Sequence, residues 1–327
     1  MGNYGSKVGK DINFNFLIGF ENFDIHIMIK HDYNFLYLTI IHMTQQPLDK
    51  IIIKKLFNTN KGKNFHRRGL QENISEIKMC FHDHSIRFNP HDSIGARIYS
   101  LGVHTRKPID DALILLNKKG FFKKTSNCIE FGSNIGTHTI YMHLQKLFKR
   151  IYAIEPNEDN YNLLLQNLID NELLNKSEVL KFAISNISGA VKLFKDDNNS
   201  GAHTLLNKNK NKNYEIVQAI TTKELFKNFK IKNIDFAFFD IEGMELVVIP
   251  DFIKEVNKNI PIFFEFAPSL YNKKEITNFC KFLDKTYNNF IFYQDTKKKF
   301  VKDELKNIHE IMKLDFEHCD ILAFNLK

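Results

Sequence analysis

From residue 127 onward, short apolar segments alternate with segments of helical pattern, and no other feature of the chain constrains its fold as strongly. Residues 128–131 and 151–154 have the length and the apolar character of strands. Residues 157–169 carry Tyr or Leu at positions 161, 164, 165 and 168, which is the spacing of one helix face. This order of strands and helices predicts an α/β fold with a mainly parallel, doubly wound sheet.

The alternation continues toward the carboxyl end. Residues 234–239 are apolar except for Asp235, as expected of a strand that is buried on both faces. The further expected strands are residues 179–184, 260–266, 290–293 and 321–324, and the further expected helices are residues 137–148 and 275–283.

The first part of the chain has a different pattern. At residues 23–29, apolar side chains occupy every second position, which is the period of a half-buried strand. The pattern becomes helical after Asp92, which can cap one helix, and Pro108 can open another. We therefore predict a strand-rich N-terminal region of unknown role at residues 1–89 and a second domain at residues 90–327.

The composition is that of an ordinary globular protein. Of the 327 residues, 43% are hydrophobic and 26% are charged, and the net charge is +8. A positive charge can indicate a nucleic-acid partner, but the lysines are spread along the chain, and its wealth of Lys, Asn, Ile and Phe is what AT-rich coding produces. We therefore expect no specific nucleic-acid partner.

Cysteine usage and hydropathy bear on the location of the protein. No apolar run approaches the roughly 18 residues that cross a bilayer, and no apolar segment follows a basic start as in a secretory signal. The cysteines lie far apart and form no C-x-x-C pair, which is typical of reduced thiols: Cys80, Cys128, Cys280 and Cys319. These features predict a cytoplasmic protein.

The amino terminus leaves a second location open. Residues 1–6 fit the M-G-x-x-x-[ST] pattern for N-myristoylation of Gly2. If Gly2 is acylated, Lys7 and Lys10 can add attraction to anionic lipid, and the protein would associate with a membrane surface. The pattern is short and matches readily by chance. The sequence makes no prediction about the oligomeric state.

Three histidines lie close together in the sequence. His82, His84 and His91 have Asp83 and Asp92 nearby, and such side chains can ligate a metal. A polar turn between two short strands explains them as well, and their spacing matches no tight ligand motif. We therefore predict no metal site.

The first motif that can carry chemistry is the segment 130–136, Glu-Phe-Gly-Ser-Asn-Ile-Gly, between an expected strand and an expected helix. Gly132 and Gly136 let the backbone turn tightly and approach a ligand without Cβ atoms in the way. The acid at the strand end, Glu130, would repel a pyrophosphate but suits a ligand with a positive amino group. The alternative is a plain glycine turn, because a lone glycine pattern is weak.

The second motif is Glu155-Pro156-Asn157, at the end of the next expected strand. A carboxylate at this place can accept hydrogen bonds from both hydroxyl groups of a ribose. Glu155 follows Glu130 by 25 residues, which leaves room for one intervening helix. The alternative is an acid that interacts with the dipole at the start of a helix.

The third motif is the segment 240–245, Asp-Ile-Glu-Gly-Met-Glu, directly after the buried run 234–239. Asp240 and Glu242 flank Ile241 at the strand end, where acids can position or deprotonate a nucleophile. The alternative, mainly for Glu245, is an acid at the start of a helix near residue 244.

In this order and spacing, the three motifs resemble those of the FkbM-type methyltransferases, a branch of the Rossmann-like S-adenosylmethionine-dependent enzymes. Residues 130–136 are similar to the family's D-x-G-A-N-x-G, with Glu130 in place of Asp and Ser133 in place of Ala. Residues 155–157 are similar to its E-P-N ribose motif, and residues 240–245 look like its D-x-E-G-x-E signature, which is the most specific of the three. The resemblance covers about residues 90–327 and does not clearly reach residues 1–89. Two further matches are weaker: Ala183-Ile184-Ser185 and Glu265.

The resemblance implies a class I methyltransferase fold, S-adenosyl-L-methionine as the cofactor, and methyl transfer to an oxygen atom of a sugar, a glycan or a small metabolite. Asp240 is the first candidate for the base, because its strand adjoins the first strand in this fold, and Glu242 is the second. His203 can line the acceptor side on a loop, although a lone loop histidine is usually solvated. The residues implied to bind the cofactor are Glu130, Gly132, Ser133, Asn134, Gly136, Glu155, Pro156, Asn157, Ala183 and Asp240.

Two other functions stay open. The first is methylation of nitrogen, although the chain lacks the N/D-P-P-Y type tetrad of many amino-directed methyltransferases. The second is a non-catalytic protein that keeps the fold and binds a glycan, a lipid surface or nucleic acid. The joint presence of Glu130, Asn134, Glu155 and Asp240 argues against the second, because a site without catalysis does not need all four.

Overall fold

The computed structural model describes residues 17–20, 23–26, 67, 74–207, 213–256, 260–295, 300–313 and 316–326. The chain forms two compact units. The first comprises residues 1–91 and 95–102, and the second comprises residues 92–94 and 103–327.

The first unit contains a four-stranded antiparallel sheet in the order β1-β2-β3-β4. The strand expected at residues 23–29 is present over its first four residues, and residues 27–29 lie outside the described part of the chain, as does the N-terminal myristoylation pattern. The strands are β1 (Leu17–Phe20), β2 (Phe23–His26), β3 (Ile77–Cys80) and β4 (Ser85–Phe88).

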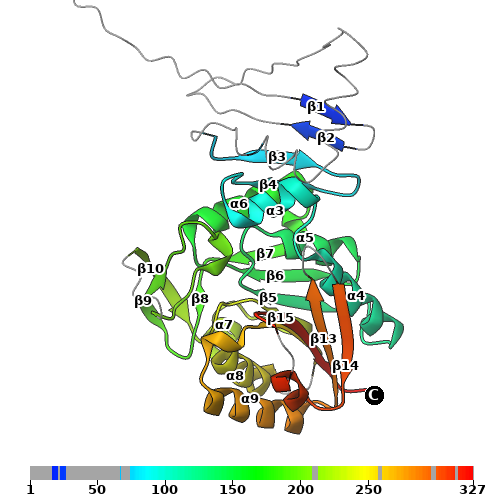
Figure 1. Cartoon of the computed structure of the whole chain (residues 1–327), viewed down its shortest axis with the longest axis vertical. Helices are drawn as coiled ribbons and strands as arrows, with labels where there is room; N and C mark the ends of the chain where they lie inside the picture. The colour runs from blue at the N-terminus through cyan, green and yellow to red at the C-terminus, as the bar shows by residue number, and fades with distance from the viewer. Residues whose placement is uncertain are drawn as a thin grey trace, which may run out of the picture. The chain divides into compact units, whose positions relative to one another are not determined.

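An eight-stranded sheet forms the centre of the second unit (Figure 1). Its order is β14-β13-β15-β12-β11-β5-β6-β7. The run from β12 to β7 is parallel, whereas β15 is antiparallel to both β12 and β13. The strands are β5 (Asn127–Phe131), β6 (Arg150–Ile154), β7 (Ser177–Leu180), β11 (Ile234–Phe239), β12 (Ile262–Phe266), β13 (Asn289–Asp295), β14 (Phe300–Leu305) and β15 (Cys319–Phe324).

Helices cover both faces of this sheet, because successive strand residues point to opposite sides. On β11, Phe236 and Phe238 pack against helices α4 and α5, whereas Ala237 and Phe239 pack against α8 and α9. The predicted α/β fold with a doubly wound, mainly parallel sheet is therefore confirmed. The helices of the second unit are α4 (Arg106–Lys118), α5 (Thr137–Leu144), α6 (Glu158–Asp170), α7 (Thr222–Asn228), α8 (Glu245–Val256) and α9 (Lys273–Thr286). Most of α3 (Ser93–Leu101) belongs to the first unit.

The strand expected at residues 179–184 is divided in the structure, and that prediction was wrong. The main-chain amide of Phe182 bonds to the carbonyl oxygen of Leu180 at 3.2 Å, and the chain turns there and leaves the sheet. Beyond the turn, β8 (Ala183–Ile184) joins a separate sheet of order β8-β10-β9, with β9 (Gly189–Phe194) and β10 (Tyr214–Ile220).

The helix expected at residues 137–148 ends earlier, at Leu144. Lys146 has a φ of 57°, in the left-handed region that cannot continue a right-handed helix. The two helices expected after Asp92 are present as α3 and α4, and Oδ2 of Asp92 accepts a hydrogen bond from the amide of Ile94. Among the described residues, no helix combines the length and the apolar character that a membrane span requires.

Candidate active site

The candidate residues lie at one edge of the eight-stranded sheet. Because β5, β6, β11 and β12 run parallel, their carboxyl ends meet at the same edge. The strand order reverses there, since β5 is followed by β6 on one side and pairs with the much later β11 on the other. Open α/β sheets bind ligands at such a switch point. Glu130, Glu155, Asp240 and Glu265 all lie at this edge.

The turn between β5 and α5 passes very close to the end of β11. The amide of Asp240 donates to the carbonyl oxygen of Phe131 at 2.9 Å. A Cβ atom on Gly132 would lie 1.7 Å from the main-chain oxygen of Asp240, and the φ of Gly132 is 83°. Only glycine fits at this position, for reasons of both space and backbone conformation. The glycine thus brings the first motif against the third.

Glu130 is completely buried beneath this turn, with an exposed fraction of 0%. Its Oε2 accepts a short hydrogen bond from the hydroxyl of Thr139, whereas its Oε1 has no hydrogen-bond partner among the described residues. The hydroxyl of Ser133 donates to the main-chain oxygen of Glu130 at 3.4 Å. Burial raises the pKa of Glu130 to about 7. A buried acceptor without a donor is costly and suits a ligand that brings one.

Glu155 follows β6 and is held by its neighbours. Its Oε2 accepts from the amide of Asn134 and its Oε1 from the amide of Asn157, both at 2.9 Å. Burial raises the pKa of Glu155 to about 7 in spite of these donors. Glu155 is therefore held in a fixed position, two residues before the N-cap of α6.

Asn157, which follows Pro156 in the second motif, has a local structural role. Asn157 is the N-cap of α6, where its side chain accepts from the amide of Asn160 at 3.0 Å. Pro156 precedes this cap.

Two other predicted residues lie in different elements. Ala183 is buried in β8 and pairs with Ala219 of β10, outside the eight-stranded sheet. Gly136 begins α5 with a φ of 87°.

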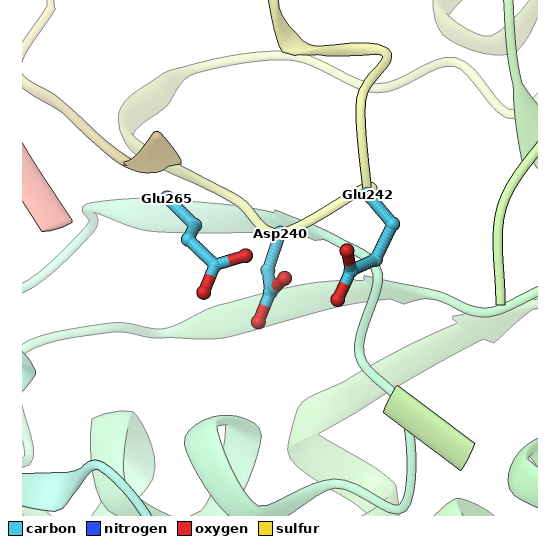
Figure 2. Close-up of side chains that lie close together, drawn as sticks. All are labelled: Asp240, Glu242 and Glu265. Atoms are coloured by element: carbon cyan, nitrogen blue, oxygen red, sulfur yellow. The ribbon is translucent and has the colours of Figure 1, made fainter. Parts of the chain in front are cut away.

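Three carboxyl groups gather at the ends of β11 and β12 (Figure 2). Asp240, Glu242 and Glu265 each have an oxygen atom within 4.8 Å of the others. Like charges this close disfavour the ionised form of one another. Burial, and then the neighbouring acids, raise the pKa of all three carboxyl groups well above their ordinary values. A carboxylate in this cluster can accept a proton from a ligand. The distances between the three carboxyl groups also suit the binding of a divalent cation.

The loop that carries two of these acids is shaped by Glu245. Its Oε1 accepts from the amide of Ile241 at 2.8 Å, and its Oε2 accepts from the amide of Gly243 at 2.9 Å and from the hydroxyl of Tyr271 at 2.5 Å. These bonds hold Glu242 at a φ of 47°, which is rarely adopted by residues other than glycine. Glu245 is thus a structural support of the loop.

His203 belongs to the segment 196–206, which follows β9. Its Nδ1 accepts from the amide of Asp196 at 3.2 Å, so its Nε2 carries the hydrogen of the neutral ring. Burial, and then the charge of Lys195, lower the pKa of His203. The same segment reaches the acidic loop, because the hydroxyl of Thr204 donates to the main-chain oxygen of Glu242 at 2.6 Å.

Sequence reasoning missed three residues of this edge. Thr139 bonds to Glu130, Asn160 bonds to the main-chain oxygen of Ser200, and Tyr271 bonds to Glu245. Thr139 and Asn160 each lie one helical turn beyond a motif that the sequence does display, so a search at that spacing could have found them. Tyr271 lies 26 residues from Glu245, and no local pattern connects the two.

The histidines near residue 90 take local roles in the structure. His84 is buried, its Nδ1 lies 2.5 Å from Oδ1 of Asp83, and its ring stacks on Phe81 with a centroid distance of 4.8 Å. The amide of His91 donates to the side chain of Asn89 at 2.9 Å.

Comparison with known proteins identifies a family. Residues 130–313, more than half of the chain, match the family model described as the Methyltransferase FkbM domain. The methyltransferase sdnD of Sordaria araneosa is 33% identical over 87 residues, which are 27% of this chain and 34% of that protein. The match thus spans about a third of the length of this relative.

Two solved structures represent the similar folds. The methyltransferase FkbM of Methylobacillus flagellatus has a TM-score of 0.40 and 11% identity over 62% of this chain and 44% of its own. The O-methyltransferase of Bacillus cereus, solved in complex with SAH, has a TM-score of 0.42 and 11% identity over 68% of this chain and 82% of its own.

Proposed function

Because the chain belongs to the FkbM methyltransferase domain family, we propose that it transfers a methyl group from S-adenosyl-L-methionine to an oxygen atom of a sugar, a glycan or a small metabolite. The eight-stranded sheet has the class I methyltransferase arrangement, with the antiparallel strand β15 inserted beside β12, and a further antiparallel strand, β14, lies at its edge. We assign the methyltransferase domain to residues 90–327.

The residues at the sheet edge fit this cofactor. Bound there, S-adenosyl-L-methionine supplies a methyl group on a positively charged sulfur atom. Glu155 would accept hydrogen bonds from the ribose hydroxyl groups, since its carboxylate is held in place by the amides of Asn134 and Asn157. Glu130 would accept from the methionine amino group through its Oε1, the buried oxygen that has no partner among the described residues. Gly132 keeps the intervening turn free of a side chain.

The gathering of Asp240, Glu242 and Glu265, whose carboxyl oxygens lie within 4.8 Å of one another, is the observation that carries the proposal for an oxygen acceptor. A hydroxyl group must lose its proton during methylation, and a carboxylate made more basic by burial and by neighbouring acids can take that proton. Asp240 is the proposed base, and Glu242 lies in the same acidic group. The remaining contribution of the site is to orient the acceptor and to exclude water.

His203 would have a role other than that of a base. Because its Nδ1 already accepts a hydrogen bond from the amide of Asp196, only its Nε2–H faces a ligand, and this atom can donate but not accept. We therefore propose that His203 orients an acceptor oxygen by donating to it.

Calorimetric titration with S-adenosyl-L-methionine tests the cofactor site. We expect micromolar binding to the intact protein and its loss in Glu155→Ala. The control is Glu304→Ala, because Glu304 is an exposed glutamate on β14, several strands away from Glu155 in the sheet order. Absence of binding to the intact protein, with and without candidate acceptors, would overturn the proposal and favour a non-catalytic binding protein.

The acceptor atom is tested with cofactor that carries a ¹³C-labelled methyl group. Incubation with pools of sugars, glycans and small metabolites should produce a methyl carbon resonance at the position of an O-methyl ether, downfield of N-methyl groups. A product with the N-methyl resonance would contradict the proposal and support methylation of nitrogen.

We infer a cytoplasmic location from the cysteines. Cys80, Cys128, Cys280 and Cys319 are free thiols, as in proteins of a reducing compartment. The alternative is a membrane surface, reached through a myristoyl group on Gly2. Mass spectrometry of the amino terminus of the protein from its native source distinguishes the two.

A further inference from the structure

The main chain at Thr204 is fixed by the end of β9. Its amide donates to the carbonyl oxygen of Phe194 at 3.0 Å, and its carbonyl oxygen accepts from the amide of Phe194 at 2.8 Å. The two residues thus form an isolated antiparallel bridge, in which each residue serves the other as both donor and acceptor. Thr204 therefore has a defined position within the segment 196–206, before any contact of its side chain is considered.

The hydroxyl group of Thr204 has two hydrogen-bond partners. It accepts from the amide of Leu206 at 3.1 Å and donates to the main-chain oxygen of Glu242 at 2.6 Å. A hydroxyl group has a single hydrogen, and the carbonyl oxygen of Glu242 can only accept, so that hydrogen is directed at Glu242. This bond connects the segment 196–206 to the loop that carries the acidic group.

The main chain of Glu242 needs support from outside. Its φ of 47° lies in the left-handed region, which residues other than glycine rarely adopt. The peptide group that joins Glu242 to Gly243 is held at both ends, because Glu245 accepts from its N–H group at 2.9 Å and Thr204 donates to its oxygen atom. Loss of the Thr204 hydroxyl would release one of these ends.

The segment 196–206 also contacts the site at two further places. A Cβ atom on Gly243 would lie 2.5 Å from Cδ1 of Leu206, so the segment packs directly against the acidic loop. The carbonyl oxygen of Ser200 accepts from Nδ2 of Asn134 at 3.0 Å and from Nδ2 of Asn160 at 3.1 Å. His203 lies between the attachments at Ser200 and at Thr204.

From this geometry, and resting on the proposed function, we propose that Thr204 is a positioning residue for methyl transfer. Its hydroxyl group holds the main chain of Glu242 so that the carboxyl group of Glu242 stays beside those of Asp240 and Glu265. It also fixes the neighbouring His203 against the same loop. Thr204 need not touch the cofactor or the acceptor, because its effect passes through Glu242.

The first test is hydrogen exchange of main-chain amides, followed by mass spectrometry of the intact protein and of Thr204→Val. Valine keeps the branched shape and removes the hydroxyl group. Peptides that cover residues 241–244 should exchange about 2–10-fold faster in the variant, the factor that corresponds to the net contribution of one hydrogen bond. Peptides from α4 should exchange equally in both. Thr204→Ser, which keeps the hydroxyl group, should resemble the intact protein.

Thr277→Val is the matched control. Thr277 is partly exposed, as Thr204 is, and its hydroxyl group also donates to a main-chain oxygen, that of Lys273 at 2.8 Å. The bond that is lost lies within α9 instead of at the acidic loop. Thr277→Val should therefore leave the exchange of residues 241–244 unchanged.

The second test separates the rate of methyl transfer from cofactor affinity. In single-turnover assays with the acceptor from the ¹³C screen, Thr204→Val should be about tenfold slower than the intact protein. Its affinity for S-adenosylhomocysteine, measured by calorimetry, should fall much less. Thr204→Ser should restore most of the rate. In a Glu242→Gln background, Thr204→Val should cost less than in the intact protein, because the two changes act on the same group.

The outcomes separate this inference from the proposed function. Unchanged exchange of residues 241–244 in Thr204→Val would overturn the role of Thr204, whatever reaction the protein performs. Equal losses of rate and affinity, or a rate in Thr204→Ser as low as in Thr204→Val, would overturn it as well. Failure of the intact protein to bind S-adenosyl-L-methionine would overturn the proposed function, and the exchange result would still decide whether Thr204 holds the acidic loop.

Discussion

The hydroxyl group of Tyr271 donates a hydrogen bond to Oε2 of Glu245 across 2.5 Å, and this bond joins the segment after β12 to the loop that carries Asp240 and Glu242. Glu245 is buried and accepts two further bonds from main-chain amides of the same loop. The ring of Tyr271 stacks on Phe266, the last residue of β12, with a centroid distance of 6.1 Å. One tyrosine therefore connects the two strand ends that supply the acidic group.

We expect Tyr271→Phe to lower the free energy of unfolding by about 1.5–3 kcal/mol, the contribution of a hydrogen bond to a charged group. Tyr287→Phe is the control, because Tyr287 donates to the neutral carbonyl oxygen of Ile260 at 2.8 Å and should cost about 0.5–1.5 kcal/mol. Urea unfolding at pH 8 measures both. Equal losses would mean that the bond to Glu245 has no special strength.

Gly132→Ala should abolish the fold or destabilise it by more than 3 kcal/mol. The new Cβ atom would lie 1.7 Å from the main-chain oxygen of Asp240, and overpacking would add to the strain of a positive φ. Gly120→Ala is matched in backbone conformation, with a φ of 77°, but has no atom within 4 Å of the new Cβ, so it should cost only about 1–2 kcal/mol. Thermal unfolding compares the two, and similar midpoints would contradict the steric argument.

Glu130 makes stability depend on pH. Its pKa is about 7 in the folded protein, against 4.5 for an ordinary glutamate, so its contribution is fully present below pH 4.5 and is lost as the pH rises through 7. Glu130→Gln imitates the protonated form. The variant should match the intact protein at pH 4 and exceed its free energy of unfolding by up to about 3 kcal/mol at pH 8.

Urea unfolding at the two pH values measures this difference. Glu304→Gln, a change at an exposed carboxyl group, is the control and should leave the free energy of unfolding nearly the same at both. A Glu130→Gln variant that is no more stable than the intact protein at pH 8 would show that Glu130 is ionised at little cost.

Asp240→Asn should reduce the rate of methyl transfer by about 10²–10⁴-fold, because an amide cannot take the proton of the acceptor. Cofactor affinity should fall much less than the rate, since the site of ribose recognition is at Glu155. Glu242→Gln should have a smaller effect on the rate if Asp240 is the base. Single-turnover assays with the acceptor from the ¹³C screen, together with calorimetry, separate rate from binding. An unchanged rate in Asp240→Asn would refute its assignment.

Several elements could be predicted from local pattern because their causes are local. The strand at Ile234–Phe239 was expected with the bounds that the structure has, since six residues buried on both faces leave a continuous apolar run. The helix after Asn157 was expected from its apolar stripe, and Asn157 caps it. We did not predict that residues 179–184 divide between two sheets, because a single turn at Phe182 does not change the hydrophobic pattern of the sequence.

The pairs at the candidate site depended on contacts between distant parts of the chain. Asp240 and Glu265 meet because β11 and β12 pair in parallel with Phe239 opposite Phe264, so the residues that follow lie side by side. That register depends on the packing of both strands against α8 and α9, and no sequence motif specifies it. The hydrogen bonds from Asn160 to Ser200 and from Tyr271 to Glu245 have the same origin.

The sequence by itself determined which acids end the strands, where the glycines allow the chain to turn, and which family the chain resembles. These features depend on residues within a few positions of one another. Only the tertiary structure decided which acids gather, which oxygen of Glu130 has no donor among the described residues, and which amides hold Glu155. Those properties depend on burial and on hydrogen bonds between elements far apart in the chain, and they exist only once the sheet has brought its strand ends together.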